Sequence, residues 1–74
     1  MEFNVSSCYM RRGERFLNEY PKIKKYDYKL DEEQDELYIT IHSLEELIKF
    51  EKQFGKIIID DDGKSLIIYD DYIE

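Results

Sequence analysis

The sequence predicts an α+β fold: a small four-stranded, mainly antiparallel sheet made of two hairpins, a helix between them packed on one face, and a short N-terminal helix. Three observations predict it. One segment alternates apolar and polar residues around an acidic turn, a second places two apolar runs around an Asp-Gly pair, and a capped helical segment separates them. This order favours a two-layer arrangement of helix on sheet. The 74 residues are enough for a single domain, residues 1–74.

At the start of the chain, Phe3 and Val5 are spaced as in a short edge strand. A first helix is predicted from about Cys8 to Glu19, because apolar residues recur there at helical spacing. Pro21 should end it, since the residue before a proline is biased away from helical geometry.

The first hairpin is predicted over residues 25–41. Residues 25–30 alternate aromatic or apolar with charged side chains, and after the acidic turn Leu37, Ile39 and Ile41 alternate with polar ones. Because residues two apart share a face of a strand, one face of this hairpin is apolar and the other amphipathic.

The clearest element is a helix from Leu44 to Phe54. Ser43 with Glu46 three residues later is typical of a capping box, and Gly55 is typical of a helix end. Helical spacing gathers an apolar stripe that should face the sheet. The stripe consists of Leu47, Phe50 and Phe54, widened by Leu44 and Ile48.

The second hairpin runs from Lys56 to Asp60 and from Ser65 to Asp70, with Gly63 in the turn. Its Ile57–Ile59 and Leu66–Ile68 runs are apolar on both faces. We therefore expect these two strands to be the interior ones.

Charge is distributed unevenly along the chain. Residues 1–30 carry seven Lys or Arg against four acids, whereas residues 31–74 carry four Lys against fourteen acids, which gives the net charge of −7. A negative surface repels nucleic acid and attracts basic proteins. The single cysteine, Cys8, allows no internal disulfide, no apolar run is long enough to span a membrane, and residues 1–4 lack the pattern of a secretory signal. We therefore expect a cytoplasmic protein.

The sequence predicts no catalytic site, metal site or cofactor. His42 is expected to contact the start of the helix, and Cys8 to fill space in the first helix. Asp60-Asp61-Asp62-Gly63 invites a calcium-loop interpretation, but Tyr69 stands where such a loop needs its bidentate Glu. A hairpin turn explains these residues better.

Three acidic runs at strand ends and turns, together with neighbouring tyrosines, are the candidate partner-binding site. Carboxylates there can form rows of negative charge, and tyrosine is enriched in protein interfaces. The alternative is a solvated surface that only keeps the chain soluble. The candidate residues are Asp31, Glu32, Glu33, Asp35, Glu36, Asp60, Asp61, Asp62, Tyr69, Asp70, Asp71, Tyr72 and Glu74.

The C-terminal half also carries a resemblance. The stretches His42–Phe50, Gly55–Asp60 and Ile67–Glu74 resemble small acidic proteins encoded by phages and prophages of low-GC Gram-positive bacteria. The resemblance implies an anti-CRISPR or related counter-defence inhibitor, which binds a host nuclease complex and occludes its nucleic-acid channel in the host cytoplasm.

The leading hypothesis is therefore a non-enzymatic inhibitor that places its acidic runs against a basic, nucleic-acid-handling host protein. The first alternative is a phage accessory or assembly protein that acts as a homodimer or larger oligomer. The second is a nucleic-acid-binding regulator, although the net charge argues against direct nucleic-acid binding. It would use Arg11, Arg12, Arg15, Lys22, Lys24 and Lys25.

Overall fold

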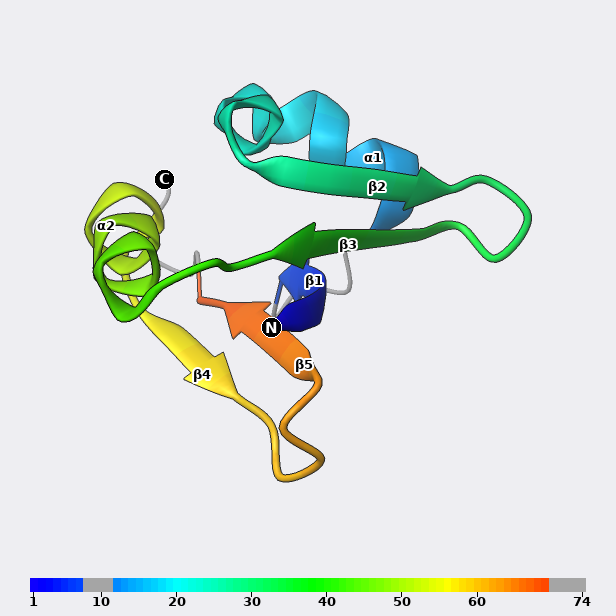
Figure 1. Cartoon of the computed structure of the whole chain (residues 1–74). Coiled ribbons are helices and arrows are strands. Elements are labelled where there is room, and N and C mark those ends of the chain that lie inside the picture. Colours follow the sequence, from blue (N-terminus) through cyan, green and yellow to red (C-terminus); the bar gives the residue numbers. More distant parts are fainter. Residues whose placement is uncertain (8–11, 70–74) are drawn as a thin grey trace.

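The structure, a computed structural model, describes residues 1–7 and 12–69. Five strands and three helical segments follow one another along the chain (Figure 1). They are β1 (Glu2–Ser7), α1 (Gly13–Glu19), the 3-10 helix η1 (Pro21–Lys25), β2 (Asp27–Asp31), β3 (Glu36–Thr40), α2 (Leu44–Phe54), β4 (Ile57–Ile59) and β5 (Ser65–Ile68). None of the described helices is long and apolar enough to cross a membrane.

The α+β class is confirmed and three of the four strand pairings are antiparallel, but the prediction of a four-stranded sheet is wrong. The sheet is mixed and has five strands in the order β2-β3-β1-β5-β4. The two predicted hairpins are present as β2–β3 and β4–β5. They do not meet, because β1 lies between them, antiparallel to β3 and parallel to β5.

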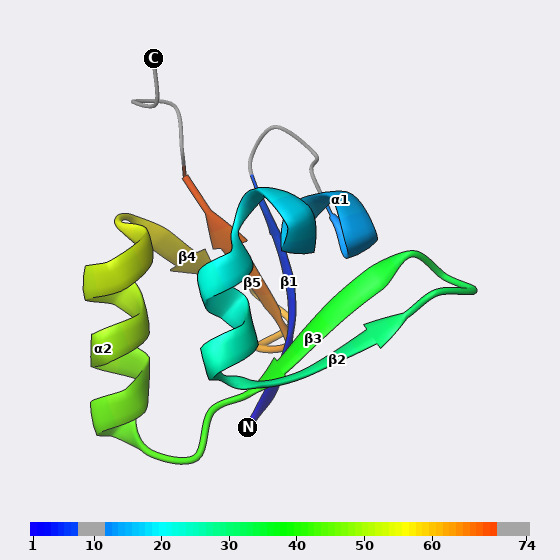
Figure 2. The ribbon, with the colours of Figure 1, turned by 90° about the horizontal axis from the view of Figure 1, so that it is seen from above.

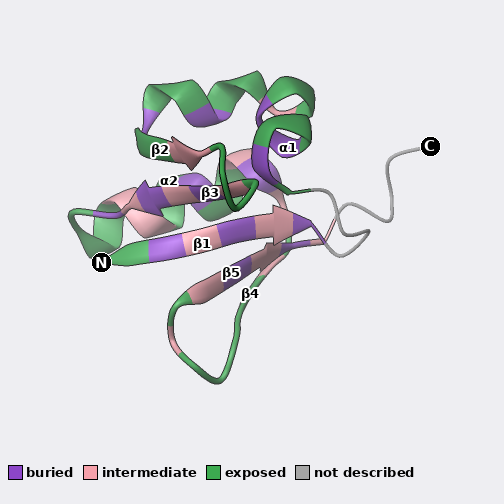
Figure 3. Cartoon of the chain, turned by 90° about the vertical axis from the view of Figure 1, so that its right-hand side faces the viewer, coloured by how far each residue is buried: buried purple, intermediate pink, exposed green. Residues whose placement is uncertain are grey.

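The N-terminal segment is therefore the central strand and not an edge. In β1 the side chains of Phe3, Val5 and Ser7 are buried, while Glu2, Asn4 and Ser6 stay partly or fully exposed (Figure 3). This period-2 pattern puts one face of β1 into the core. Because β1 is flanked on both sides, its backbone is paired along both edges.

The core lies between one face of the sheet and a layer formed by α1, η1 and α2. Figure 2 shows α2 beside the segment of α1 and η1. The sheet supplies Phe3, Val5, Leu37, Ile39, Leu66 and Ile68 to the buried cluster, and the helical layer supplies Phe16, Leu17, Ile23, Phe50 and Phe54.

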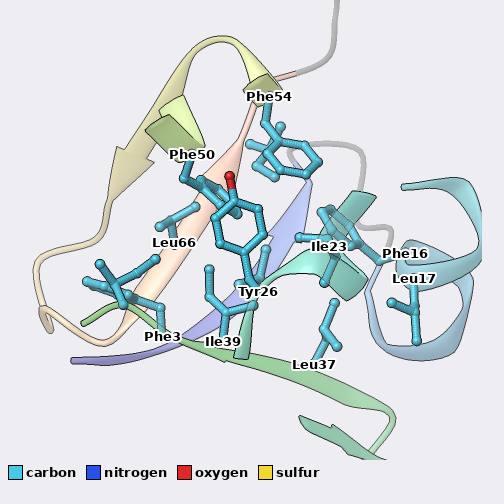
Figure 4. Packing of buried hydrophobic residues seen from close by; sticks show 13 residues of the cluster. Phe3, Phe16, Leu17, Ile23, Tyr26, Leu37, Ile39, Phe50, Phe54 and Leu66 are labelled. Carbon is cyan, nitrogen blue, oxygen red and sulfur yellow. The ribbon is translucent and has the colours of Figure 1, made fainter. Parts of the chain in front are cut away.

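Tyr26 joins the two parts of the core (Figure 4). Its ring centroid lies 5.2 Å from that of Phe50 and 6.3 Å from that of Phe54. Its hydroxyl donates to Oε1 of Gln53 over 2.7 Å. Burial, with a smaller effect from the negative charge of Glu46, raises the pKa of Tyr26. A single tyrosine thus anchors α2 to the strand that follows η1.

The bounds and caps of α2 agree with the sequence, but its apolar stripe is narrower. Ser43 Oγ accepts from the Glu46 N–H over 3.1 Å, and the Glu46 carboxylate accepts from the His42 N–H over 2.8 Å. Phe50 and Phe54 are buried, whereas Leu44 is 73% exposed and Ile48 is 45% exposed. The prediction that Leu44 and Ile48 face the sheet is wrong. The aromatic rings of Phe50 and Phe54 make the contact between α2 and the core, and they occupy only a narrow strip of the helix surface.

The first helix is shorter than expected. α1 begins at Gly13. Arg12 is extended and pairs with Ser6 as an isolated bridge, so the predicted helix does not include Arg12. Residues 8–11, including Cys8, lie outside the described residues. The helix ends before Pro21 as predicted, and this proline then opens η1, where its missing N–H costs no hydrogen bond.

Only one strand of the second hairpin is interior. β5 lies between β1 and β4, whereas β4 forms an edge of the sheet. Ile58 is 39% exposed and Ile59 is 44% exposed. The expectation of two interior strands is wrong for β4. The strand beside β5 is β1, so the two hairpins do not pair with each other and β4 is left at the edge of the sheet.

Candidate protein-interaction surface

The described helices all cover the same sheet face, and the strands' alternate side chains form the opposite one, which we call the open sheet face. Each of its residues is at least partly exposed. The pairing register places them side by side across the strands. They are Glu2, Asn4 and Ser6 of β1, Asp27, Lys29 and Asp31 of β2, Glu36, Tyr38 and Thr40 of β3, Ile58 of β4, and Ser65 and Ile67 of β5.

Tyr38 lies near the middle of this face. Its strand neighbours are Asn4 on one side and Lys29 on the other. The Tyr38 hydroxyl donates to Oε1 of Glu36 over 2.7 Å, and the Lys29 Nζ lies 5.4 Å from the centre of the ring. The bond to Glu36, then desolvation, raises the pKa of Tyr38. An aromatic ring with a neutral donor is thereby held among charged groups.

A shallow groove crosses the open sheet face beside Tyr38. It extends from β1 and β3 to the β4–β5 turn, whose backbone is tied to β1 because the Asn4 N–H donates to the Lys64 carbonyl over 2.7 Å. Carboxylates outnumber cations along it. The groove is lined by Glu2, Asn4, Glu36, Tyr38, Asp62, Lys64 and Ser65.

Two acids of the β2–β3 turn have structural partners. Asp31 Oδ1 accepts from the N–H groups of Glu33 and Gln34 over 3.1 and 3.2 Å. Asp35 has a φ of 55° and its Oδ1 accepts from the Glu14 N–H over 3.2 Å at the start of α1. Their side chains therefore shape the turn and tie it to α1.

The β4–β5 turn shows the same use of carboxylates. Asp60 Oδ1 accepts from the Asp61 N–H over 2.8 Å. Asp62 Oδ1 accepts from the N–H groups of Lys64 and Ser65 over 2.8 and 3.1 Å, and its Oδ2 accepts from the Ser65 hydroxyl over 3.1 Å. The bond from the Lys64 N–H is the largest cause that lowers the pKa of Asp62. The hairpin-turn interpretation of residues 60–63 agrees with this geometry.

The structure does not gather the predicted acids into one row. The strand register puts the β2–β3 turn near the end of β1 at Ser7 and the β4–β5 turn near its beginning. Glu32, Glu33 and Asp61 are exposed. Glu36 and Asp62 are the predicted residues that share the groove.

The third acidic run lies mostly outside the described residues. Asp70, Asp71, Tyr72 and Glu74 belong to residues 70–74, which the structure does not describe. Tyr69 is described and half-buried, with the Lys56 Nζ 5.7 Å from its ring centre. Tyr69 continues the alternation of the open sheet face beyond β5.

Most residues of the open sheet face were missed from the sequence, among them Glu2, Asn4 and Tyr38. The signal for Tyr38 was present, because it alternates with Leu37 and Ile39 and so had to face away from the core. Glu2 and Asn4 could be placed only once β1 was known to lie beside β3.

Other candidate chemistry is sparse in the described residues. The His42 Nε2 lies 3.0 Å from Asp27 Oδ2, and both side chains are exposed. No group of three or more His, Cys, Asp or Glu in residues 1–7 and 12–69 is arranged to hold a metal ion. A groove along α2 is lined by residues of both charges, among them Glu45, Glu46, Lys49 and Lys52. Its charges balance, unlike those of the open sheet face.

Comparison with protein-family models, with curated proteins and with solved structures gives no match to this chain. The resemblance to small phage proteins therefore stays a prediction from the sequence.

Proposed function

We propose that this chain is a non-enzymatic binding protein that docks its open sheet face against the basic surface of a nucleic-acid-handling protein and occludes that surface. The supporting observation is one uncovered sheet face on which acids surround a half-buried tyrosine. The strands contribute four acids and one cation to this face. The acids are Glu2, Asp27, Asp31 and Glu36, and the cation is Lys29.

Electrostatics supports a basic partner. A surface with one dominant sign of charge accelerates encounter with the opposite sign and discourages like-charged molecules. Tyr38 adds a rigid aromatic group that is already held by Glu36, so little conformational freedom is lost on docking. A partner whose groove normally holds nucleic acid supplies the matching positive charge. The resemblance to counter-defence proteins agrees with an inhibitory outcome.

The distribution of cations favours this proposal over nucleic-acid binding. Arg12, Arg15, Lys22, Lys24 and Lys25 are exposed on α1, η1 and the residue before α1. Four of them, Arg15, Lys22, Lys24 and Lys25, belong to the helical layer, on the other side of the sheet from the open face, whereas Arg12 pairs with Ser6 of β1 as an isolated bridge. Arg15 is engaged by Glu19, with 3.4 Å between Nε and Oε2. A gel shift at low salt should show no retardation of DNA or RNA by the isolated chain.

Capture from a nuclease-treated bacterial lysate tests the proposal. The wild-type chain should retain basic proteins, and added double-stranded DNA should compete for them. The double variant Glu2→Gln with Glu36→Gln should retain much less, with the largest loss at low salt. Its amide at position 36 can still accept the Tyr38 hydroxyl, so the face keeps its shape.

The matched control removes the same charge elsewhere. Glu45→Gln with Glu51→Gln changes two exposed carboxylates of α2. This variant should capture as the wild type does. Equal losses in the two double variants would mean that only net charge matters, and the proposal would be wrong.

A further inference from the structure

Within residues 1–7 and 12–69, no strand pairs with the outer side of the edge strand β4. Along its inner side, the Tyr69 N–H donates to the Lys56 carbonyl over 2.8 Å and the Asp60 N–H donates to the Ser65 carbonyl over 2.9 Å. Hydrogen-bonded pairs alternate along an antiparallel ladder, so Ile58 also points its backbone groups toward β5. The N–H and C=O groups of Ile57 and Ile59 therefore point outward, where Figure 1 shows no further strand.

The three residues of β4 include no charged side chain and no proline. Exposed edges are commonly protected by charged side chains, proline or bulges. The opposite edge, β2, carries charges at Asp27, Lys29 and Asp31. β4 consists of three isoleucines, of which Ile58 and Ile59 are exposed, with Lys56 directly before it and Asp60 at its far end.

We infer that the partner of β4 is a second copy of this chain, paired antiparallel about a two-fold axis at Ile58. This register sets Ile57 opposite the other copy's Ile59, so the outward N–H and C=O groups of each meet and form four hydrogen bonds. It also sets Lys56 opposite the other copy's Asp60, twice. The side chains of Lys56, Ile58 and Asp60 lie on the open sheet face.

Charge selects this register among those the backbone allows. An axis at Ile57 would set Lys56 opposite Ile58, and an axis at Ile59 would set Asp60 opposite Ile58. Only the axis at Ile58 pairs every charge with its opposite, as cross-strand neighbours prefer. The two five-stranded sheets then form one continuous sheet, and the two open faces lie side by side. This inference does not depend on the proposed function.

Sedimentation velocity and amide exchange of the unaltered chain test the pairing. A three-residue strand buries less than the roughly 1,200 Å² of a standard interface, so association should rise with concentration between about 5 and about 500 µM. Over that range the exchange of the Ile57 and Ile59 amides should slow. The Ile58 amide, already bonded to β5, should stay protected throughout. A monomer at every concentration, or new protection at β2, would overturn the inference.

Charge exchange tests the register. Lys56→Glu and Asp60→Lys each set like charges opposite one another at both ends of the interface, so each variant alone should dimerise at least about tenfold more weakly. Mixed in equal amounts, the two variants should form a heterodimer, because every pair is again opposite in sign. The double variant should also dimerise. Equal behaviour of the single variants, their mixture and the wild type would refute the register.

Matched controls carry the same charge changes away from the edge. Lys64→Glu lies in the turn and Glu51→Lys lies on α2, and both residues are exposed. These variants should dimerise like the wild type. Circular dichroism of every variant identifies loss of fold, and the mixing experiment stays decisive because the two folded single variants differ only in charge.

Discussion

At the scale of single residues, the start of α1 and the β4–β5 turn depend on backbone conformations that few side chains accept. Gly13 and Gly63 have φ values of 58° and 69°. Their surroundings differ. A Cβ on Gly13 would overlap the Oδ1 and carbonyl oxygens of Asp35, whereas a Cβ on Gly63 would meet no atom within 4 Å.

The two glycines therefore form a matched pair. Gly63→Ala should cost only the left-handed conformation, about 1 kcal/mol of the free energy of unfolding. Gly13→Ala adds the overlap with Asp35 and should cost about 2–5 kcal/mol. Urea unfolding of both variants measures the difference. Equal losses would show that α1 and the β2–β3 turn do not approach each other as described.

Asp62 gives the turn a pH dependence. Its folded-state pKa is lowered, first by the Lys64 N–H, so ionised Asp62 stabilises the fold. That contribution is complete above the unfolded-state pKa of an aspartate and is lost as pH falls through the folded-state value. In urea titrations from neutral to strongly acidic pH, Asp62→Asn should lose stability less steeply on the acid side than the wild type. Asp61→Asn, which changes a neighbouring exposed carboxylate, should keep the wild-type slope.

At the scale of elements, local signals determined what could be predicted. α2 was predicted with its observed bounds, because Ser43, Glu46 and Gly55 act within one or two helical turns. The hairpins followed from alternation and turn residues. β1 was misplaced because nothing local distinguishes a central strand from an edge strand in six residues. Its position is set by pairing with β3 and β5, which lie far along the chain.

The narrow stripe of α2 leads to a prediction. Phe50 is fully buried against Tyr26 and Phe54, so Phe50→Ala should lower the free energy of unfolding by about 3–5 kcal/mol. Leu44 is 73% exposed, and Leu44→Ala should change it by less than about 0.5 kcal/mol. Thermal or urea unfolding measures both. A large loss of unfolding free energy for Leu44→Ala would mean that the buried stripe of α2 is as wide as helical spacing predicts.

At the scale of the whole molecule, the sheet separates two surfaces of different charge. The helical layer exposes most of the described cations of the first half, and the open sheet face carries acids around Tyr38. The acidic character was predicted from the sequence, but its location was not. Runs such as Asp60–Asp62 attract notice in a sequence because the residues are adjacent, yet carboxylates there are used to close a turn. Glu2, by contrast, is isolated in sequence, and it shares the groove with Glu36 only because β1 pairs with β3.

The most direct test of the account places a photoreactive side chain on each surface. A benzophenone amino acid at Thr40, on the open sheet face, should cross-link a basic nucleic-acid-handling protein in a nuclease-treated bacterial lysate. The same group at Lys52, exposed on α2, should not. Cross-linking from position 52 alone, or the same proteins from both positions, would contradict the claim that the open sheet face is the binding surface.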